Sequence, residues 1–478
     1  MRVLLVSGYE LGHQPLQVAS PAAVLHAAGH EVRTVDLSLA PLEPDAVGWA
    51  DCAALSVPMH TATRLAVSAA DSIRRIRPRL PVCAYGLYAG VLADEGTSHL
   101  VDQTIAGEYE TELLRWVDAV AAGRRALPTA HVVTITREPH RAPRRDAMAP
   151  LDRYARLRLG PQEKLVGYTE ASHGCSHRCR HCPVPVVYAG RVRPVDLETV
   201  LADVDQLVDA GAEHVTFGDP DFLNAPRHSL RVVDEVHRRH PGLTFDATIK
   251  VEHLLRQEEA VEILARSGLL FVVSAFESVD DDILARLDKG HTAAESSRAV
   301  HLLRRLGVEV RPSWLPFTPW TTVETVVRIV DFVAGHDIVP NVDTVQYSIR
   351  LLVPPGSLLL DDDPDWARPF DPDALGHPWV SSDPRVDALQ ARLAETAAGA
   401  TDLPPEEAFL LVHSAVTEAA RDAGVEPPRE VPAPTRRVVP GLSEAWFCCA
   451  EPPGVGQACA VGQGAAPPLR GSSSAAGV

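Results

Sequence analysis

The sequence feature that most limits what this chain can fold into is a group of three closely spaced cysteines. Residues 171–185 contain Cys175, Cys179 and Cys182 in the spacing CxxxCxxC. Thiolates this near to one another repel, so they converge on one point only where a metal neutralises their charge. Structural zinc usually has four ligands, whereas a reactive metal centre keeps a position open. The spacing therefore predicts a metal centre with an open position.

Two metals fit this motif. Thiolate-rich ligation suits iron–sulfur clusters, and a four-iron cluster held by three cysteines leaves one iron free for a small molecule. Zinc is the alternative, because short Cys/His-rich tracts often bind it. Its fourth ligand would then be His173, His177 or His181. The choice depends on the residues that follow the motif.

The motif resembles the cluster loop of the radical S-adenosylmethionine (radical SAM) superfamily. The resemblance implies a 4Fe-4S cluster on Cys175, Cys179 and Cys182. In that superfamily the open iron chelates the amino and carboxylate groups of SAM, and an electron from the cluster cleaves SAM to a 5′-deoxyadenosyl radical. His181 departs from the pattern, since the superfamily more often has an aromatic residue before the third cysteine.

A regular strand–helix repeat begins at residue 164. Six βα units are too few for an eight-stranded barrel but match the partial (β/α)6 barrel of radical SAM enzymes. The carboxyl ends of parallel barrel strands share one face, and the cysteine loop follows the first strand. The predicted strands are 164–170, 213–218, 243–249, 269–276, 308–315 and 342–349.

The later strand ends resemble the SAM-binding positions of the same superfamily. A Gly-Asp turn ends the second strand, where the family has a Gly-Gly-Glu-like turn for the SAM amino group. A Ser and a Glu end the fourth strand, and basic residues at strands three and five suit the SAM carboxylate. Each signal alone is weak, since such residues often cap helices, but their order behind the cysteines favours SAM over zinc. The implied set is Gly218, Asp219, Lys250, Ser274, Glu277 and Arg311.

Residues 1–122 alternate short apolar runs with helical patterns, which predicts a doubly wound α/β domain. Its ligand-binding edge is expected at the loops 8–15, 58–61, 86–90 and 107–110. The stretches 25–32, 56–60, 85–89 and 107–110 resemble the cobalamin-binding domain that precedes many radical SAM cores. The DxHxxG signature, which supplies a histidine to cobalt, is absent from the sequence, as it is from many such members. Cobalamin is therefore a candidate cofactor, and a domain that has lost it and serves as a lid is the alternative.

Single residues of this N-terminal domain carry weaker signals. His13 and His60 are candidates for facing a corrin, although a lone loop histidine is more often solvated. Glu108 is interpreted, with its neighbour Glu110, as a charge pair at a helix start. Cys52 and Cys83 lie within apolar strands and are expected to be buried, inert thiols.

The C-terminal tail contains adjacent cysteines, Cys448 and Cys449, in the string Cys-Cys-Ala-Glu-Pro. This string resembles the tail of the CUAEP/CCAEP family of radical SAM (seleno)proteins, in which one of the two positions is selenocysteine in some members. The resemblance implies a catalytic or redox role for the pair. The alternative is an unstructured tail with incidental thiols.

These patterns predict five segments. They are a cobalamin-binding-like α/β domain (1–122), an Arg/Pro-rich connector (123–163), the partial barrel (164–358), a mostly helical extension (359–426), and a Pro/Gly-rich linker with the CCAEP tail (427–478).

The overall charge excludes some partners. Lys and Arg total 45 against 63 Asp and Glu, a net charge of −18, which disfavours non-specific nucleic-acid binding. The sequence has no apolar run long enough to span a membrane and no signal peptide at its start, and its clustered cysteines suit a reducing cytoplasm.

We therefore expect a cytoplasmic radical SAM enzyme that acts on a small molecule or peptide and takes electrons from a donor such as flavodoxin or ferredoxin. With cobalamin, methyl transfer to an unactivated carbon is expected; without it, rearrangement or sulfur/selenium chemistry. RNA modification is the rival reaction, and the acidic charge disfavours it. A zinc-stabilised or cobalamin-binding regulatory protein is the non-enzymatic alternative.

Overall fold

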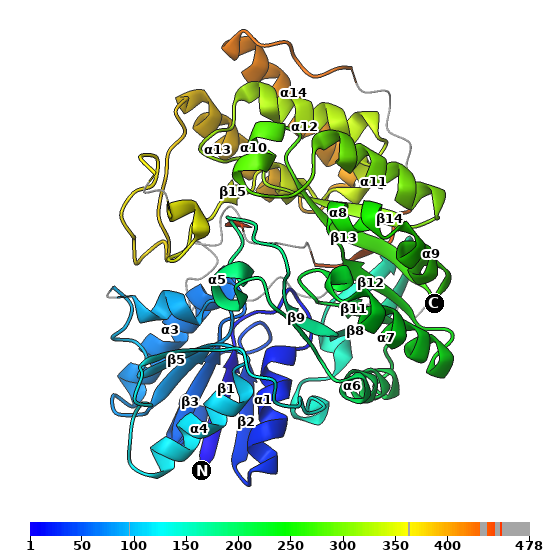
Figure 1. The fold of residues 1–478 in the computed structure, drawn as a ribbon. Helices are drawn as coiled ribbons and strands as arrows, with labels where there is room; N and C mark the ends of the chain where they lie inside the picture. Colours follow the sequence, from blue (N-terminus) through cyan, green and yellow to red (C-terminus); the bar gives the residue numbers. More distant parts are fainter. Residues whose placement is uncertain (95, 362–363, 431–436, 445–449, 452–478) are drawn as a thin grey trace, which may run out of the picture.

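A computed structural model describes residues 1–94, 96–361, 364–430, 437–444 and 450–451. The structure has two α/β parts in contact, with the N-terminal part at the bottom of Figure 1 and the barrel part above it. The carboxyl ends of the N-terminal strands point towards the barrel part, so the loops at these strand ends lie between the two sheets. No helix in the described part of the chain has the length and apolarity to cross a membrane.

The N-terminal sheet is wholly parallel, with strand order β2-β1-β3-β4-β5-β6. This order confirms the predicted doubly wound fold and puts its switch point between β1 and β3. The strands are β1 (Arg2–Ser7), β2 (Glu31–Asp36), β3 (Cys52–Ser56), β4 (Val82–Tyr85), β5 (Gln103–Gly107) and β6 (His131–Thr134). The helices are α1 (Leu16–Ala27), α2 (Pro44–Trp49), α3 (His60–Ile76), η1 (Ala89–Ala93) and α4 (Glu110–Ala121).

The segment predicted as a connector also contributes to both sheets. β6 extends the N-terminal sheet, and β7 (Arg156–Leu159) joins the barrel sheet. Two short helices, η2 (Arg145–Ala147) and η3 (Leu151–Arg153), lie between them. Arg145 is buried, and its guanidinium donates to both oxygens of Asp203, at 2.8 and 2.9 Å. This bidentate pair fixes the segment to the barrel part.

The barrel sheet has the order β14-β13-β12-β11-β8-β7-β16, of which the five strands from β14 to β8 are parallel. It curls into the predicted partial barrel, with helices on its outer face (Figure 1). The strands are β8 (Gln162–Thr169), β11 (His214–Phe217), β12 (Thr244–Thr248), β13 (Leu269–Glu277), β14 (Glu309–Trp314) and β16 (Gly441–Leu442). The helices are α6 (Leu197–Asp209), η4 (Phe222–Asn224), α7 (Pro226–Arg239), α8 (Val251–Arg256), α9 (Glu258–Arg266), α10 (Asp281–Arg286), α11 (Ala293–Arg305) and α12 (Val323–Gly335).

The predicted sixth strand, 342–349, is wrong. The chain there forms η5 (Val339–Asn341) and η6 (Thr344–Tyr347). At the outer edge of β14, hydrogen bonds to side chains replace those to a neighbouring strand. Trp314 N donates to the side chain of Gln346 at 3.0 Å, and the side chain of Asn341 donates to Val310 O at 2.8 Å. These two bonds take the place of ladder hydrogen bonds at Val310 and Trp314.

The remaining elements cover the barrel. β9 (Ser172–Gly174) and β10 (Val192–Pro194) form a small ribbon beside the cysteine loop, which leads into α5 (Val184–Tyr188). The predicted C-terminal helices are present as α13 (Pro384–Gly399) and α14 (Pro405–Ala423), and both pack on the barrel core. η7 (Leu358–Leu360), β15 (Arg350–Leu351) and β17 (Ala450–Glu451) complete the described elements, and β17 pairs with β15.

Candidate active site

The three cysteines lie on one cavity of about 250 Å³ at the carboxyl ends of the barrel strands. Cys175 and Cys179 are buried and Cys182 is half-buried. The loop that carries them turns at Gly174, whose φ is +72° and where a Cβ would lie 2.3 Å from Arg191 O. Asn224 Oδ1 accepts from Ser176 N at 3.1 Å. These contacts hold the start of the loop. We call this space the cysteine cavity.

The surroundings of the thiols suit a multi-metal cluster. Burial raises the pKa of Cys175 to about 11 and also raises the pKa of Cys179, so both thiolates need a cation to stabilise them. Lys250 Nζ lies 3.6 Å from Cys179 Sγ. Ligands of a single zinc ion lie about 3.8 Å apart. Among the described residues, the sets of three metal-ligand atoms within 4.8 Å of one another contain no cysteine.

Most of the predicted SAM residues share this cavity. Gly218, Asp219, Lys250, Glu277 and Arg311 all line it with the cysteines. Ser274 does not, and its prediction is corrected. The inward residues of β13 are the odd-numbered ones, such as Val273 and Ala275. Ser274 points to the other face, where its hydroxyl donates to Ile249 O at 2.7 Å.

The Gly-Asp turn after β11 is built into the cysteine loop. Asp219 is buried, and its two oxygens accept from Ala171 N at 2.8 Å and from Ser172 Oγ at 2.6 Å. Burial raises the pKa of Asp219 to about 7, against the effect of these hydrogen bonds. A Cβ on Gly218 would lie 1.9 Å from the hydroxyl of Tyr168, so any larger residue there would have to displace this side chain. In this structure, Asp219 holds the start of the cysteine loop.

A buried charged group lies beside the cluster loop. Glu277 accepts from His181 Nε2 and from Lys289 Nζ, both at 3.1 Å. Burial alone would raise the pKa of Glu277, but Lys289 and His181 lower it to about 2. His181, weighed as a zinc ligand from sequence, is therefore a partner of Glu277. Arg311 pairs with Asp343 at 2.7 Å and keeps its position on the cavity wall.

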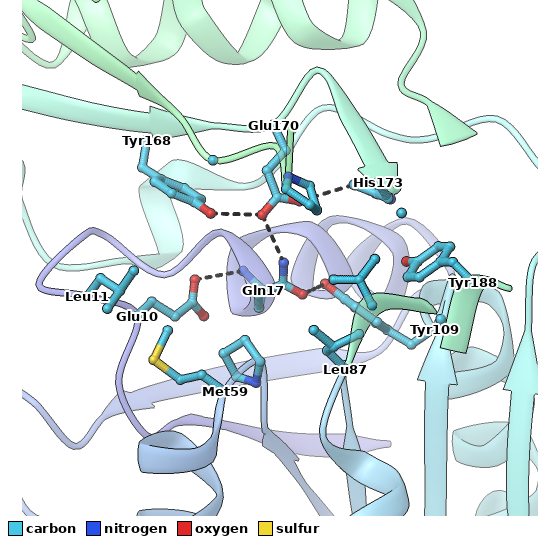
Figure 2. A pocket seen from close by; sticks show the side chains of 16 residues that line it. Glu10, Leu11, Gln17, Met59, Leu87, Tyr109, Tyr168, Glu170, His173 and Tyr188 are labelled. Atoms are coloured by element: carbon cyan, nitrogen blue, oxygen red, sulfur yellow. Dashed lines mark hydrogen bonds and ion pairs between the residues drawn. The ribbon is translucent and has the colours of Figure 1, made fainter. Parts of the chain in front are cut away.

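A second cavity, of about 190 Å³, lies at the carboxyl edge of the N-terminal sheet (Figure 2). All four loops predicted for this edge contribute to it, with side chains such as Leu11, Met59, Leu87 and Tyr109. We call it the edge cavity. It shares Leu11, Tyr168, Val184, Gly218 and Pro220 with the cysteine cavity, so the two adjoin.

Polar groups on the edge cavity converge on Gln17 (Figure 2). Its backbone N–H donates to Glu10, its side-chain amide donates to Glu170 at 3.4 Å, and Tyr109 donates to it. Burial raises the pKa of both Glu10 and Glu170. The cavity therefore offers hydrogen-bonding groups from Gln17, Tyr109, Glu10 and Glu170.

The two candidate corrin-facing histidines have different positions. His13 lines the cysteine cavity, with its ring 4.8 Å from that of Tyr168. His60 lies 3.0 Å from Ala374 O through its Nε2 and lines neither cavity. Cys52 and Cys83 are buried, as predicted, and burial raises the pKa of each thiol.

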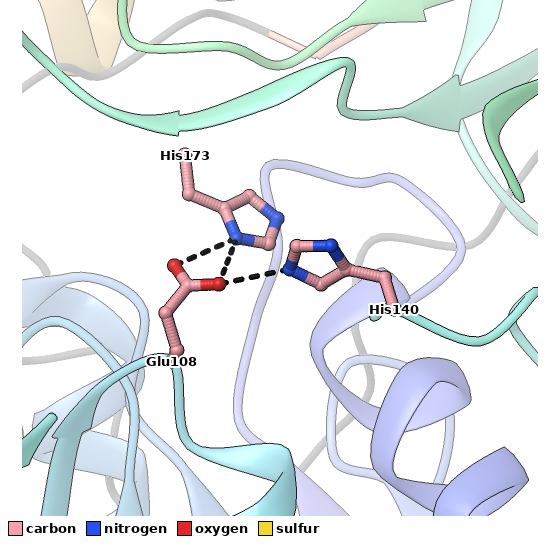
Figure 3. Close-up of side chains that lie close together, drawn as sticks. All are labelled: Glu108, His140 and His173. Carbon is pink, nitrogen blue, oxygen red and sulfur yellow. Dashed lines mark hydrogen bonds and ion pairs between the residues drawn. The ribbon is translucent and has the colours of Figure 1, made fainter. Parts of the chain in front are cut away.

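Glu108, interpreted from the sequence as part of a charge pair with Glu110 at a helix start, pairs instead with residues from other parts of the chain. It is buried and accepts from His140 Nε2 at 2.8 Å, from His173 Nδ1 at 3.0 Å and from Tyr188 at 3.0 Å (Figure 3). Burial lowers the pKa of His173, but Glu108 raises it to about 10. The cluster connects the end of β5 to the cysteine loop. Its members are too far apart in the chain for any sequence signal to reveal it.

The predicted tail cysteines, Cys448 and Cys449, lie outside the described residues. Described residues on either side of them contact the barrel. Leu442 and Glu444 line the cysteine cavity, and the backbone of Ala450–Glu451 pairs with Arg350–Leu351.

Comparisons with known proteins agree with this geometry. Residues 169–333 match the model of the radical SAM superfamily. The hopanoid C-3 methylase of Methylococcus capsulatus is 22% identical over 333 residues, which cover 64% of this chain and 62% of the methylase. The chain thus spans less than two thirds of the length of this relative.

Two solved structures share the fold. The cobalamin-dependent SAM radical enzyme OxsB, with aqua-cobalamin bound, superposes with a TM-score of 0.66 at 13% identity, over 87% of this chain and 71% of that chain. The radical SAM methyltransferase TsrM of Kitasatospora setae, with tryptophan and a SAM analogue bound, gives 0.57 at 20% identity, over 70% and 71%. At these identities the likeness shows the fold alone. Residues 169–333, with their cysteine loop at the carboxyl face of a partial barrel, form a radical SAM domain, an enzyme domain that holds a 4Fe-4S cluster and SAM.

Proposed function

We propose that the chain cleaves SAM reductively in the cysteine cavity and uses the resulting 5′-deoxyadenosyl radical on a small molecule or peptide. The observation that carries this proposal is the joint lining of one cavity by three cysteines and several charged side chains. Cys175, Cys179 and Cys182 hold the cluster. When bound, the cluster supplies one electron, which comes from a reduced flavodoxin or ferredoxin in the cytoplasm.

The chain's own residues position SAM. Lys250 and Arg311 present cationic groups to its carboxylate, because both line the cavity and Lys250 lies beside Cys179. Gly218 leaves room for the side chain of Tyr168 at the second strand end, and Asp219 secures the loop in front of the cluster. Glu277 neutralises Lys289 next to the cluster loop.

We further propose that the edge cavity binds cobalamin and that the reaction is methyl transfer. The cavity lies at the switch point of a doubly wound sheet, where such folds bind ligands. Its apolar side chains Leu11, Met59 and Leu87 suit the corrin face, and the polar group around Gln17 suits the amide side chains at the corrin rim. The cavity adjoins the cysteine cavity, so a methyl donor there would be near SAM and substrate.

Anaerobic reconstitution tests both proposals. The protein is loaded with iron and sulfide, with or without hydroxocobalamin, and assayed for cobalt and for 5′-deoxyadenosine after reduction. We expect a cluster, one cobalt and SAM cleavage, with cluster and cleavage lost in Cys179→Ala and retained in Cys83→Ala. Met59→Trp should fill the edge cavity and reduce cobalt without reducing iron. A cluster without cobalt in the unmodified protein would refute the cobalamin proposal and favour rearrangement or sulfur chemistry; zinc in place of iron would refute both.

We also propose that Cys448 and Cys449 act in the later steps, as a hydrogen-atom or electron donor or as a carrier of a sulfur-bound intermediate, as in the CCAEP-tail family that the chain resembles. Support comes from the flanking residues, since Glu444 lines the cysteine cavity and β17 pairs with β15. Replacing both cysteines by Ala should leave SAM cleavage unchanged and stop product formation. Cys459→Ala is the matched control. Unchanged product formation in the double variant would contradict this role.

A further inference from the structure

A second group of metal-ligand atoms lies beside the cysteine loop but outside both cavities. It consists of His177, Asp221 and His253, whose ligand atoms lie within 4.8 Å of one another. Asp221 Oδ2 is 2.7 Å from His253 Nδ1 and 3.6 Å from His177 Nε2. The three side chains come from the cysteine loop, from the start of η4 and from α8. None of them lines the cysteine cavity or the edge cavity.

These three atoms are buried and make no hydrogen bond within the described structure. The side chain of Asp221 is 0% exposed, and its other oxygen, Oδ1, accepts from Leu223 N at 3.3 Å. Asp221 Oδ2 lies at ion-pair distance from both nitrogens, but buried polar atoms that make no hydrogen bond are costly, and three of them meet at this point. The contrast with Glu108 is clear, because both of its oxygens accept hydrogen bonds from His140, His173 or Tyr188.

A divalent cation would satisfy all three atoms at once. Two imidazole nitrogens and one carboxylate oxygen form a ligand set that suits Zn²⁺ and other first-row metals. Glu252 Oε2 lies 3.5 Å from His177 Nδ1, the nitrogen that faces away from Asp221. A carboxylate in that position holds the imidazole in the tautomer whose Nε2 is free to bind metal.

We propose that His177 Nε2, Asp221 Oδ2 and His253 Nδ1 bind one divalent transition-metal ion, with Zn²⁺ as the reference ion. His177 lies between Cys175 and Cys179 in the chain, so the ion ties the middle of the cysteine loop to the barrel. Asn224 and Asp219 already hold the start of that loop. This proposal rests on the ligand geometry and not on the proposed reaction.

The test counts zinc in the cluster-loaded protein. Unmodified protein and variants are equilibrated in a chelator-buffered Zn²⁺ series, and zinc and iron are measured by mass spectrometry. His253→Gln and Asp221→Asn should bind one zinc fewer than unmodified protein. His240→Gln is the matched control, because its imidazole also pairs with a carboxylate, that of Asp205 at 2.7 Å. Glu252→Gln should weaken zinc binding by roughly 10–100-fold.

Zinc bound elsewhere, for example by tail thiols, is the same in every variant, so the difference of one ion identifies the site. Iron content reports whether each variant folds and loads its cluster, and His253→Gln decides the result if Asp221→Asn fails to fold. Equal zinc in unmodified protein and His253→Gln would overturn the proposal. So would loss of the ion in the control, or its loss in His140→Gln, which would assign the ion to the Glu108 cluster.

Discussion

Replacing Glu277 by Gln removes one negative charge from the interior next to the cluster loop. The side chain keeps its size, but Lys289 loses its counter-charge and His181 loses a charged acceptor. The pKa of Glu277 lies at about 2 instead of 4.5. At 1.36 kcal/mol per pKa unit, this shift corresponds to about 3 kcal/mol of stability at neutral pH. Removing one partner of a buried ion pair costs about 3–5 kcal/mol, which agrees.

Urea unfolding followed by tryptophan fluorescence measures this loss, since buried Trp314 faces Glu277 on the neighbouring strand. We expect a free energy of unfolding lower by about 3 kcal/mol at pH 7. Because the pKa of Glu277 is depressed, its contribution is present above pH 4.5 and is lost as pH falls towards 2. Roughly 1 kcal/mol should be gone by pH 4.

Glu262→Gln is the control, because Glu262 is exposed and lies 4.0 Å from Arg266. The free energy of unfolding of Glu262→Gln should be lower than that of unmodified protein by less than about 0.5 kcal/mol. Adding Lys289→Met to Glu277→Gln should recover part of the stability by removing the unpaired cation. Equal stability of Glu277→Gln and unmodified protein, or a double variant as unstable as the sum of both single losses, would refute this reasoning.

Three further predictions concern the surroundings of the cavities. Gly218→Ala should displace Tyr168 and lower stability by about 1–3 kcal/mol in urea unfolding, whereas Gly242→Ala, with open space around it, should not. Arg145→Leu leaves Asp203 buried without its partner and should cost about 3–5 kcal/mol in the same assay; a loss under about 1 kcal/mol would contradict this. Glu108→Gln should lower the free energy of unfolding most below pH 6.5. The difference from unmodified protein should shrink as pH rises towards 10, because His173, whose pKa is raised, loses its charge and its ion pair with Glu108 over that range. A difference that does not change with pH would argue against this ion pair.

The sequence predicted the elements whose hydrophobic pattern is local. The apolar runs expected within residues 1–122 are present as strands of the first sheet, and the first five predicted barrel strands are present as well, because buried parallel strands appear in the sequence as short apolar runs. β6 was missed, since it is an edge strand within an Arg- and Pro-rich stretch. The pattern at 342–349 predicts a strand because nothing local in the sequence shows that Asn341 and Gln346 form hydrogen bonds with the edge of β14.

The gathering of candidate residues around one cavity was predictable where they are close in sequence or at successive strand ends. The cysteines and five of the six predicted SAM residues share one cavity. Ser274 does not line the cavity, because successive side chains of a strand point to opposite faces and Ser274 lies between two residues that point inward. The contact of Glu277 with His181 and Lys289 joins separate elements, and only the fold brings such groups together.

The strand β16 has a consequence for the order of events during synthesis. It adds to the sheet edge at β7, and just beyond it Glu444, which lines the cysteine cavity, accepts from the hydroxyl of Tyr9 at 3.5 Å, so a late segment of the chain contacts an early one beside that cavity. The cavity wall is complete only after residues 441–444 have left the ribosome. Before then the cluster loop, made much earlier, has no such wall in front of it. The interval between these two moments is a period in which iron and sulfide can reach the cysteines without crossing a finished wall.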